Sequence, residues 1–109
     1  MAALVALRHP ALIAALAIFS NQGEVCIAGS RLYVHDAIYD AFMEKVAHHA
    51  AEMRPGNPLD PATALGSMVD ERQTRSVMAR IAAGQAEGAT LRIGGRQLHT
   101  ESGLSLIHI

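Results

Sequence analysis

The sequence predicts an α/β fold in which helices dominate and two short strands belong to a larger sheet. Half of the 109 residues are hydrophobic, much of that fraction is alanine, and Trp is absent. This composition is typical of helices packed on a sheet. Two stretches, Ile38–Met53 and Thr74–Ile81, carry apolar residues at the spacing of a helix with one buried face. At this length the chain forms one domain at most.

The charge and the cysteine content exclude several classes of protein. Nine Lys and Arg residues are matched by ten Asp and Glu residues, without a basic stripe or an acidic tail, which argues against nucleic acid as a partner. A single cysteine forms no internal disulfide and fits a reducing compartment, so we expect a cytoplasmic protein. The sequence contains no dinucleotide fingerprint, phosphate-binding loop or zinc pattern.

The first element is an alanine- and leucine-rich segment, for which three interpretations compete. A signal peptide needs a small-residue cleavage site, and none separates the apolar residues from Phe19. A membrane span needs about 20 apolar residues, whereas the uninterrupted apolar run covers only Ala11–Phe19. We therefore expect a helix from about Pro10, because proline suits the first helical turn, to about Ser20.

The segment Phe19–Arg31 departs from this pattern and contains the only cysteine, Cys26. Gly23 and Gly29 on either side supply flexible or left-handed positions, which indicates a turn between two elements. A lone thiol can be a small buried hydrophobe, whereas a thiol on a turn between rigid elements can face a cleft. On the residues alone, both interpretations stay open.

A strand and a helix are expected next. Residues 31–35 alternate weakly and contain Leu, Tyr and Val, which predicts a short strand. Asp36 can cap the helix that follows, and Pro55 and Gly56 end it. The buried stripe of this helix is expected to consist of Ile38, Phe42, Val46, Ala50 and Met53.

Two adjacent histidines on this helix, His48 and His49, raise the question of a metal site. Neighbouring helical residues point about 100° apart, and we identified Glu44 as the only potential ligand one turn away. We therefore expect solvated histidines at the helix end and no bound metal.

A proline-rich connector follows the helix. Residues 54–63, RPGNPLDPAT, combine three prolines with Gly and Asn, which is typical of an ordered surface loop. A short turn is expected to begin at Asp60, with Pro61 in its first position. We interpret this stretch as a connector within one domain.

One more helix and one more strand complete the expected elements. Asp70 can cap a helix, and Gly84 and Gly88 mark the end of that helix. Residues 90–93 predict the second short strand, and Gly94 with Gly95 predicts a turn.

A resemblance to a known family rests on the residues around Cys26. The matching positions are Phe19, Gly23, Glu24, Cys26, Ala28, Gly29, Ser30 and Arg31. In this order they resemble the active-site cysteine signature of the aldehyde dehydrogenase superfamily, in which Gln or Glu stands two residues before the cysteine. The resemblance continues through RLYVHDAIYDAF, RPGNPLDPATALGSMVDERQ and AEGATLRIGG. The sequence of the proline-rich loop in particular is similar to that of bacterial aminoaldehyde dehydrogenases.

The resemblance implies an oxidoreductase in which Cys26 is the catalytic residue. Its thiolate would add to an aldehyde, and oxidation by NAD or NADP would leave a thioester that water hydrolyses to the carboxylic acid. The backbone N–H of Cys26 would form half of an oxyanion hole. Glu24 is expected to be structural, because the family also accepts Gln there and Gln cannot take up a proton.

The resemblance also implies that NAD or NADP is bound, mainly by an N-terminal domain outside this sequence. Gln73 matches a family glutamine near the cofactor ribose, with a solvated surface glutamine as an equal alternative, and Ser76 stands where many members have a lysine. Arg31 is expected to order the cysteine turn. The expected partners are an aldehyde substrate and further copies of the parent protein in a homodimer or homotetramer, without nucleic acid or membrane.

We therefore expect residues 1–103 to be part of an aldehyde dehydrogenase catalytic domain, with residues 1–9 departing from the family pattern. Residues 104–109, LSLIHI, match nothing in the family and are expected to be an artefactual tail, with a genuine edge strand as the alternative. The isolated fragment is expected to be inactive. The alternative functions are a non-enzymatic small protein and an acylating, coenzyme A-dependent aldehyde dehydrogenase.

Overall fold

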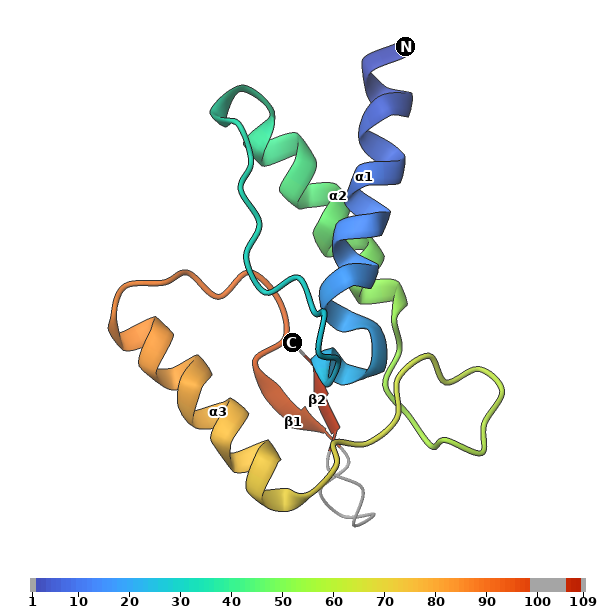
Figure 1. Cartoon of the computed structure of the whole chain (residues 1–109), viewed down its shortest axis with the longest axis vertical. Helices are drawn as coiled ribbons and strands as arrows, with labels where there is room; N and C mark the ends of the chain where they lie inside the picture. The colour runs from blue at the N-terminus through green and yellow to red at the C-terminus, as the bar shows by residue number, and fades with distance from the viewer. Residues whose placement is uncertain (1, 99–105, 109) are drawn as a thin grey trace. The chain divides into compact units, whose positions relative to one another are not determined.

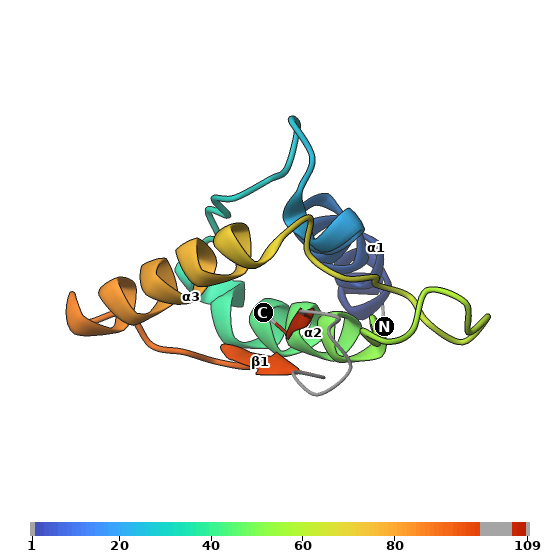
Figure 2. The same cartoon turned by 90° about the horizontal axis from the view of Figure 1, so that it is seen from below.

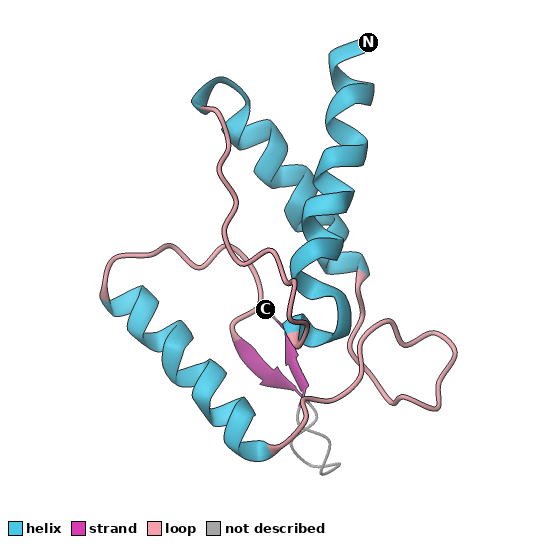
Figure 3. Ribbon diagram, in the orientation of Figure 1, coloured by secondary structure: helices cyan, strands magenta, loops and turns pink. Residues whose placement is uncertain are grey.

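The computed structural model describes residues 2–98 and 106–108 of the chain. Helices account for most of the regular structure (Figure 3), which confirms the helix-dominated class. The chain divides into two compact units, one ending at Met53 and one beginning at Arg54, and each is described by itself. In chain order the elements are α1 (Ala2–Phe19), the 3₁₀ turns η1 (Ser20–Gly23) and η2 (Asp36–Ile38), α2 (Tyr39–Glu52), α3 (Glu71–Ala86), β1 (Arg96–Leu98) and β2 (Leu106–His108).

Helix α1 is longer than the sequence predicted. It begins at Ala2 and not at Pro10, and the proline lies inside the helix. Alanine and leucine have high helix propensities, so the residues before Pro10 continue the helix although proline offers no backbone N–H. The end of the helix at Phe19 agrees with the prediction. Among the described helices, none combines the length and the apolar character that a membrane crossing requires.

The core of the first unit lies between α1 and α2, which run side by side (Figures 1 and 2). Ala11 and Ala15 of α1 are fully buried, and Phe42 and Val46 of α2 pack against them. The small alanine side chains leave room for the Phe42 ring in a closely packed interior. The predicted stripe on α2 is confirmed at Phe42, Val46 and Ala50. Partly buried residues complete the cluster, namely Ala14, Phe19, Val34 and Met43.

The segment before α2 differs from the prediction. Residues 31–35 are not a strand, because a strand needs a neighbour for its backbone groups and the described part of this unit contains none. The cap before α2 is His35 and not Asp36, since the His35 Nδ1 accepts a hydrogen bond from the Ala37 N–H at 3.1 Å. Ile38 is 40% exposed, so the buried stripe begins only at Phe42.

A closed surface loop opens the second unit. Pro55 and Leu65 form a parallel bridge, and the Gly56 N–H donates to the Leu65 carbonyl at 3.0 Å. The turn predicted at Asp60 is confirmed, because the Asp60 carboxylate accepts a hydrogen bond from the Ala62 N–H at 2.9 Å. The loop therefore satisfies much of its own backbone, as Asp and Asn turns commonly do.

The start of α3 is the one that the sequence predicts. Asp70 is extended, and its carboxylate accepts a hydrogen bond from the Gln73 N–H at 2.6 Å, which makes it the N-cap. Thr74 is 1% exposed, and its hydroxyl donates to the Asp70 carbonyl at 3.0 Å. The cap and the first buried residue of the helix are therefore joined.

The end of α3 depends on glycine. Gly88 has a φ of 98°, and its N–H donates to the Gln85 carbonyl at 3.1 Å. The Ala89 N–H donates to the Gly84 carbonyl at 2.9 Å. These two bonds make a Schellman motif, which favours glycine in the left-handed position. The helix passes through Gly84 and ends at Ala86, so only Gly88 terminates it.

The second predicted strand lies further along the chain than expected. Residues 90–93 are not a strand, and β1 begins at Arg96, which stands opposite His108 in an antiparallel pair with β2. Gly94 and Gly95 have φ of 70° and 68°, so the chain turns there and extended pairing starts only afterwards. Strand β2 falls within the last six residues of the chain. The other three, at positions 104, 105 and 109, lie outside the described residues. That this tail is artefactual stays a prediction.

Candidate active site

Cys26 lies on a β-turn between α1 and α2. The Ala28 N–H donates to the Val25 carbonyl at 3.0 Å, so Cys26 and Ile27 occupy the two central positions. The thiol is exposed, and Ile27 is 85% exposed. The turn predicted around the cysteine is therefore confirmed, and a buried thiol is excluded within this unit.

The end of α1 anchors this turn. The Gly29 N–H donates at 2.9 Å to the Ala17 carbonyl, one of the acceptors that the end of a helix leaves unpaired. A Cβ atom at position 29 would lie 3.3 Å from the Ala17 Cβ, which is tighter than an ordinary contact. Glycine therefore allows the backbone after the cysteine to approach α1 closely.

The residues between α1 and the turn form a left-handed run. Asn21, Gln22 and Gly23 have φ of 49°, 60° and 77°. The Asn21 carbonyl accepts a hydrogen bond from the Glu24 N–H at 2.9 Å, and the Asn21 Nδ2 donates to the Glu24 carbonyl at 3.1 Å. A Cβ atom at Gly23 would lie 3.2 Å from the Ile18 carbonyl oxygen. The chain therefore reverses tightly against the end of α1.

A nucleophile and a hydrogen-bond donor come together at one residue of this turn. The bond that closes the turn does not use the N–H of Cys26, which donates no hydrogen bond among the described residues. A thiolate can attack an electrophilic carbon, and a backbone N–H can stabilise the negative charge that then develops on oxygen. The turn can therefore support covalent catalysis.

Glu24 is the acid nearest to Cys26 in the sequence. Both its backbone N–H and its carbonyl are bonded to Asn21, and the residue is half-buried. These backbone bonds agree with a structural role, which stays a prediction. The same holds for Arg31, which is exposed just after the turn.

Gln73, the residue assigned to cofactor binding, lies in the first turn of α3. It is exposed, as is Ser76 three residues later. Its backbone N–H donates to the Asp70 cap, which fixes the main chain at this position. The side-chain amide takes no part in this capping bond. Cys26 belongs to the first unit and Gln73 to the second.

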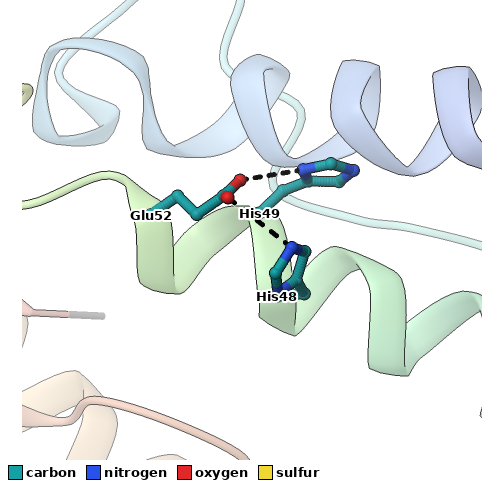
Figure 4. Close-up of polar contacts among 3 residues, drawn as sticks. All are labelled: His48, His49 and Glu52. Atoms are coloured by element: carbon teal, nitrogen blue, oxygen red, sulfur yellow. Dashed lines mark hydrogen bonds and ion pairs between the residues drawn. The ribbon is translucent and has the colours of Figure 1, made fainter.

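The two histidines of α2 share a carboxylate that the sequence analysis missed. Figure 4 shows the Glu52 carboxylate facing both rings, with His48 Nε2 at 3.5 Å from Glu52 Oε1 and His49 Nδ1 at 3.4 Å from Glu52 Oε2. The spacing of three and four residues could have revealed this contact. The His48 side chain is 69% exposed and that of His49 only 13%, so the prediction of solvated histidines is confirmed only for His48. Within the described ranges, no group of three His, Cys, Asp or Glu side chains could hold a metal ion.

Comparison with known proteins points to one family. The sequence model of the aldehyde dehydrogenase family matches residues 7–106. An aldehyde dehydrogenase of Vibrio cholerae is 42% identical over 91 residues, which cover 84% of this chain and 18% of the relative. The chain therefore spans about a fifth of the length of such relatives.

Solved structures give the same result. An indole-3-acetaldehyde dehydrogenase in complex with NAD+ has a TM-score of 0.91 at 47% identity, and the match covers 94% of this chain and 21% of that one. A gamma-glutamyl-gamma-aminobutyraldehyde dehydrogenase from Burkholderia cenocepacia has a TM-score of 0.88 at 46% identity, over 93% and 20% of the two chains.

Proposed function

The chain belongs to the aldehyde dehydrogenase family, and we propose that it supplies the nucleophile of an NAD- or NADP-dependent oxidoreductase that converts an aldehyde into a carboxylic acid. The observation that carries this proposal is the exposed Cys26 thiol at the centre of its turn. A parent enzyme longer than this chain, its cytoplasmic location and its assembly as a homodimer or homotetramer belong to the same proposal.

Cys26 acts on the aldehyde directly in this proposal. Its Sγ bonds to the carbonyl carbon, and the electron pair of the carbonyl bond moves to the oxygen, to which the Cys26 N–H can donate a hydrogen bond. After oxidation the same sulfur holds the acyl group as a thioester, and hydrolysis releases the acid and frees the thiolate. Losing one oxyanion donor typically costs about 10²-fold or more in rate. A change in the orientation of this turn that moved the Cys26 N–H away from the oxygen would therefore lower kcat.

Gln73 is the residue of this chain that we propose to contact the cofactor. Its exposed amide offers both a donor and an acceptor, which suits a ribose hydroxyl. NAD or NADP, when bound, supplies the hydride acceptor for the oxidation. The NAD+ complex of one solved relative supports a nicotinamide cofactor.

The names of two solved relatives suggest a substrate class. One is named for indole-3-acetaldehyde and the other for gamma-glutamyl-gamma-aminobutyraldehyde, which are both nitrogen-bearing aldehydes. The second agrees with the resemblance of the connector loop to aminoaldehyde dehydrogenases. We propose nitrogen-bearing aldehydes as the class to assay first.

A segment exchange tests the proposed function. Residues 7–106 replace the matching segment of the indole-3-acetaldehyde dehydrogenase, and NADH formation is followed with indole-3-acetaldehyde and NAD+. We expect the chimera to form NADH and Cys26→Ser to lower kcat by at least about 10³-fold, because a hydroxyl replaces the thiolate nucleophile. The thiol is exposed, so this substitution should leave the fold intact.

Two outcomes contradict the proposal. One is a folded chimera that binds NAD+ and forms no NADH, and the other is a Cys26→Ser chimera as active as its parent. Adding coenzyme A to the assay separates hydrolysis from acyl transfer, since an acylating enzyme would release acyl-coenzyme A. The isolated chain, given the same aldehyde and NAD+, should form no NADH.

A further inference from the structure

Asn21 is bonded to Glu24 through both its main chain and its side chain. Its carbonyl accepts the Glu24 N–H at 2.9 Å, and its Nδ2 donates to the Glu24 carbonyl at 3.1 Å. We propose that Asn21 is a positioning residue, which acts through the Glu24 backbone to fix the turn that presents Cys26. This inference rests on the proposed function of Cys26 as the nucleophile.

The backbone at Asn21 explains why the position suits this residue. With φ 49° and ψ 42°, Asn21 begins the left-handed run that continues through Gln22. Asparagine enters the left-handed region more readily than other residues with a side chain, whereas alanine is disfavoured there. Glycine also adopts this conformation, but it has no amide to donate to Glu24.

The bonds of Asn21 complete a support on both sides of the cysteine. Before the turn, the Asn21 bonds fix both polar backbone groups of Glu24, which lies two residues from Cys26. After the turn, the Gly29 N–H is fixed to the Ala17 carbonyl at 2.9 Å. Without the Asn21 side chain, the Glu24 carbonyl loses this donor. The segment between the two supports can then rotate the Cys26 Sγ and N–H away from the substrate.

Three substitutions separate backbone conformation from the side-chain bond. Asn21→Gly keeps the left-handed conformation and loses the amide donor. Asn21→Asp keeps the size of the side chain but places a carboxylate oxygen against the Glu24 carbonyl. Asn21→Ala loses both the donor and the conformational preference. Because Asn21 is exposed, none of these changes opens a cavity.

The test uses the segment-exchanged enzyme described above and compares kcat, KM for NAD+ and melting temperature. We expect Asn21→Ala and Asn21→Asp to lower kcat by about 10-fold or more, because a small misplacement of reacting groups is costly. Asn21→Gly should lose less. All three should keep the KM for NAD+ of the parent, with a small fall in melting temperature from the lost side-chain bond. Asn57→Ala is the matched control, since it removes a side-chain bond to the backbone in the surface loop and should leave kcat unchanged.

Hydrogen exchange in the intact 109-residue chain gives a readout that does not depend on activity. The Glu24 amide should exchange faster in Asn21→Ala than in the parent, since its acceptor is no longer held in the left-handed conformation. The proposal is overturned if kcat stays within twofold of the parent in both the Ala and the Asp variants. It is also overturned if kcat falls only in proportion to a lower melting temperature, or if the Glu24 amide exchanges at the parent rate.

The two proposals fail in different ways. If Cys26→Ser is inactive while the Asn21 variants are fully active, only the positioning role is wrong. If Cys26→Ser is fully active, the proposed function is wrong and the positioning role is wrong with it.

Discussion

Two turns of this chain are held in place by different means. In the surface loop of the second unit, the turns carry their own acceptors, because the Asn57 Oδ1 takes the Leu59 N–H at 2.9 Å and the Asp60 Oδ1 takes the Ala62 N–H at 2.9 Å. The turn that presents Cys26 is held in another way, since the Gly29 N–H just after it donates to the Ala17 carbonyl at the end of α1.

The difference shows what each turn can do. Side-chain acceptors in the surface loop occupy backbone N–H groups and make the loop largely independent of its surroundings. The cysteine turn is supported from outside, which leaves the Cys26 N–H without an acceptor in the described part of the chain. A turn supported in this way can present both a thiol and a donor, but its shape depends on α1.

The largest effect is expected from a substitution in the core between α1 and α2, because the cysteine turn is bonded to the end of α1. Phe42→Ala removes a side chain that is 7% exposed and packs on Ala11 and Ala15. Core truncations of this kind cost about 3–5 kcal/mol, so urea unfolding followed by circular dichroism should show that loss, with a smaller one for Phe42→Leu. Hydrogen exchange should become faster at Gly29 and stay unchanged at Ala62. Unchanged protection of the Gly29 amide would show that the turn does not depend on this core.

A smaller effect is expected at the contact between the turn and α1. Gly29→Val adds a Cβ, which would lie 3.3 Å from the Ala17 Cβ, and two methyl groups beyond it. Overpacking of this kind costs about 1–3 kcal/mol. Thermal unfolding of the chain measures the loss, and Gly29→Ala should lose less. Introducing Ala17→Gly beside Gly29→Val should recover part of the stability. No recovery would mean that the crowding lies elsewhere.

The N-cap of α3 in the second unit is, like the turns of the surface loop, held by a bond between residues that are close in sequence. Asp70→Ala removes the acceptor of the Gln73 N–H, and the loss of an N-cap costs about 1 kcal/mol. Asp70→Asn should keep most of the stability, because its side-chain oxygen can still accept the bond. Urea unfolding compares the two variants, and equal losses would rule out the capping bond as the cause.

The smallest effect is expected in the surface loop itself. Asn57→Ala removes one exposed hydrogen bond to the Leu59 N–H, worth about 0.5 kcal/mol at the lower end for such bonds. Asn57→Asp keeps an acceptor oxygen and should match the parent in thermal unfolding. A loss as large as that of Gly29→Val would show that this loop also depends on contacts beyond itself.

Much of the local structure could be predicted from sequence. Asp70 and Asp60 were identified as a cap and a turn residue because their side chains bond to backbone groups two or three positions away. The stripe through Phe42 and Val46 followed from helical spacing alone. The predicted start of α1 at Pro10 is wrong, because this proline lies inside the helix and not in its first turn. The carboxylate beside the histidines belongs to Glu52, one turn after them, and not to Glu44.

In the candidate site, too, some features could be predicted from the sequence and others depend on the tertiary structure. The sequence determined that Cys26 stands in a turn between glycines, since glycine and the break in apolar spacing are visible in the chain itself. Only the tertiary structure decided that Gly29 bonds to Ala17 and that the thiol is exposed, because these depend on how the chain returns to α1. Strand positions were also decided at that level, since a strand exists only where a second one pairs with it, as β1 does with β2.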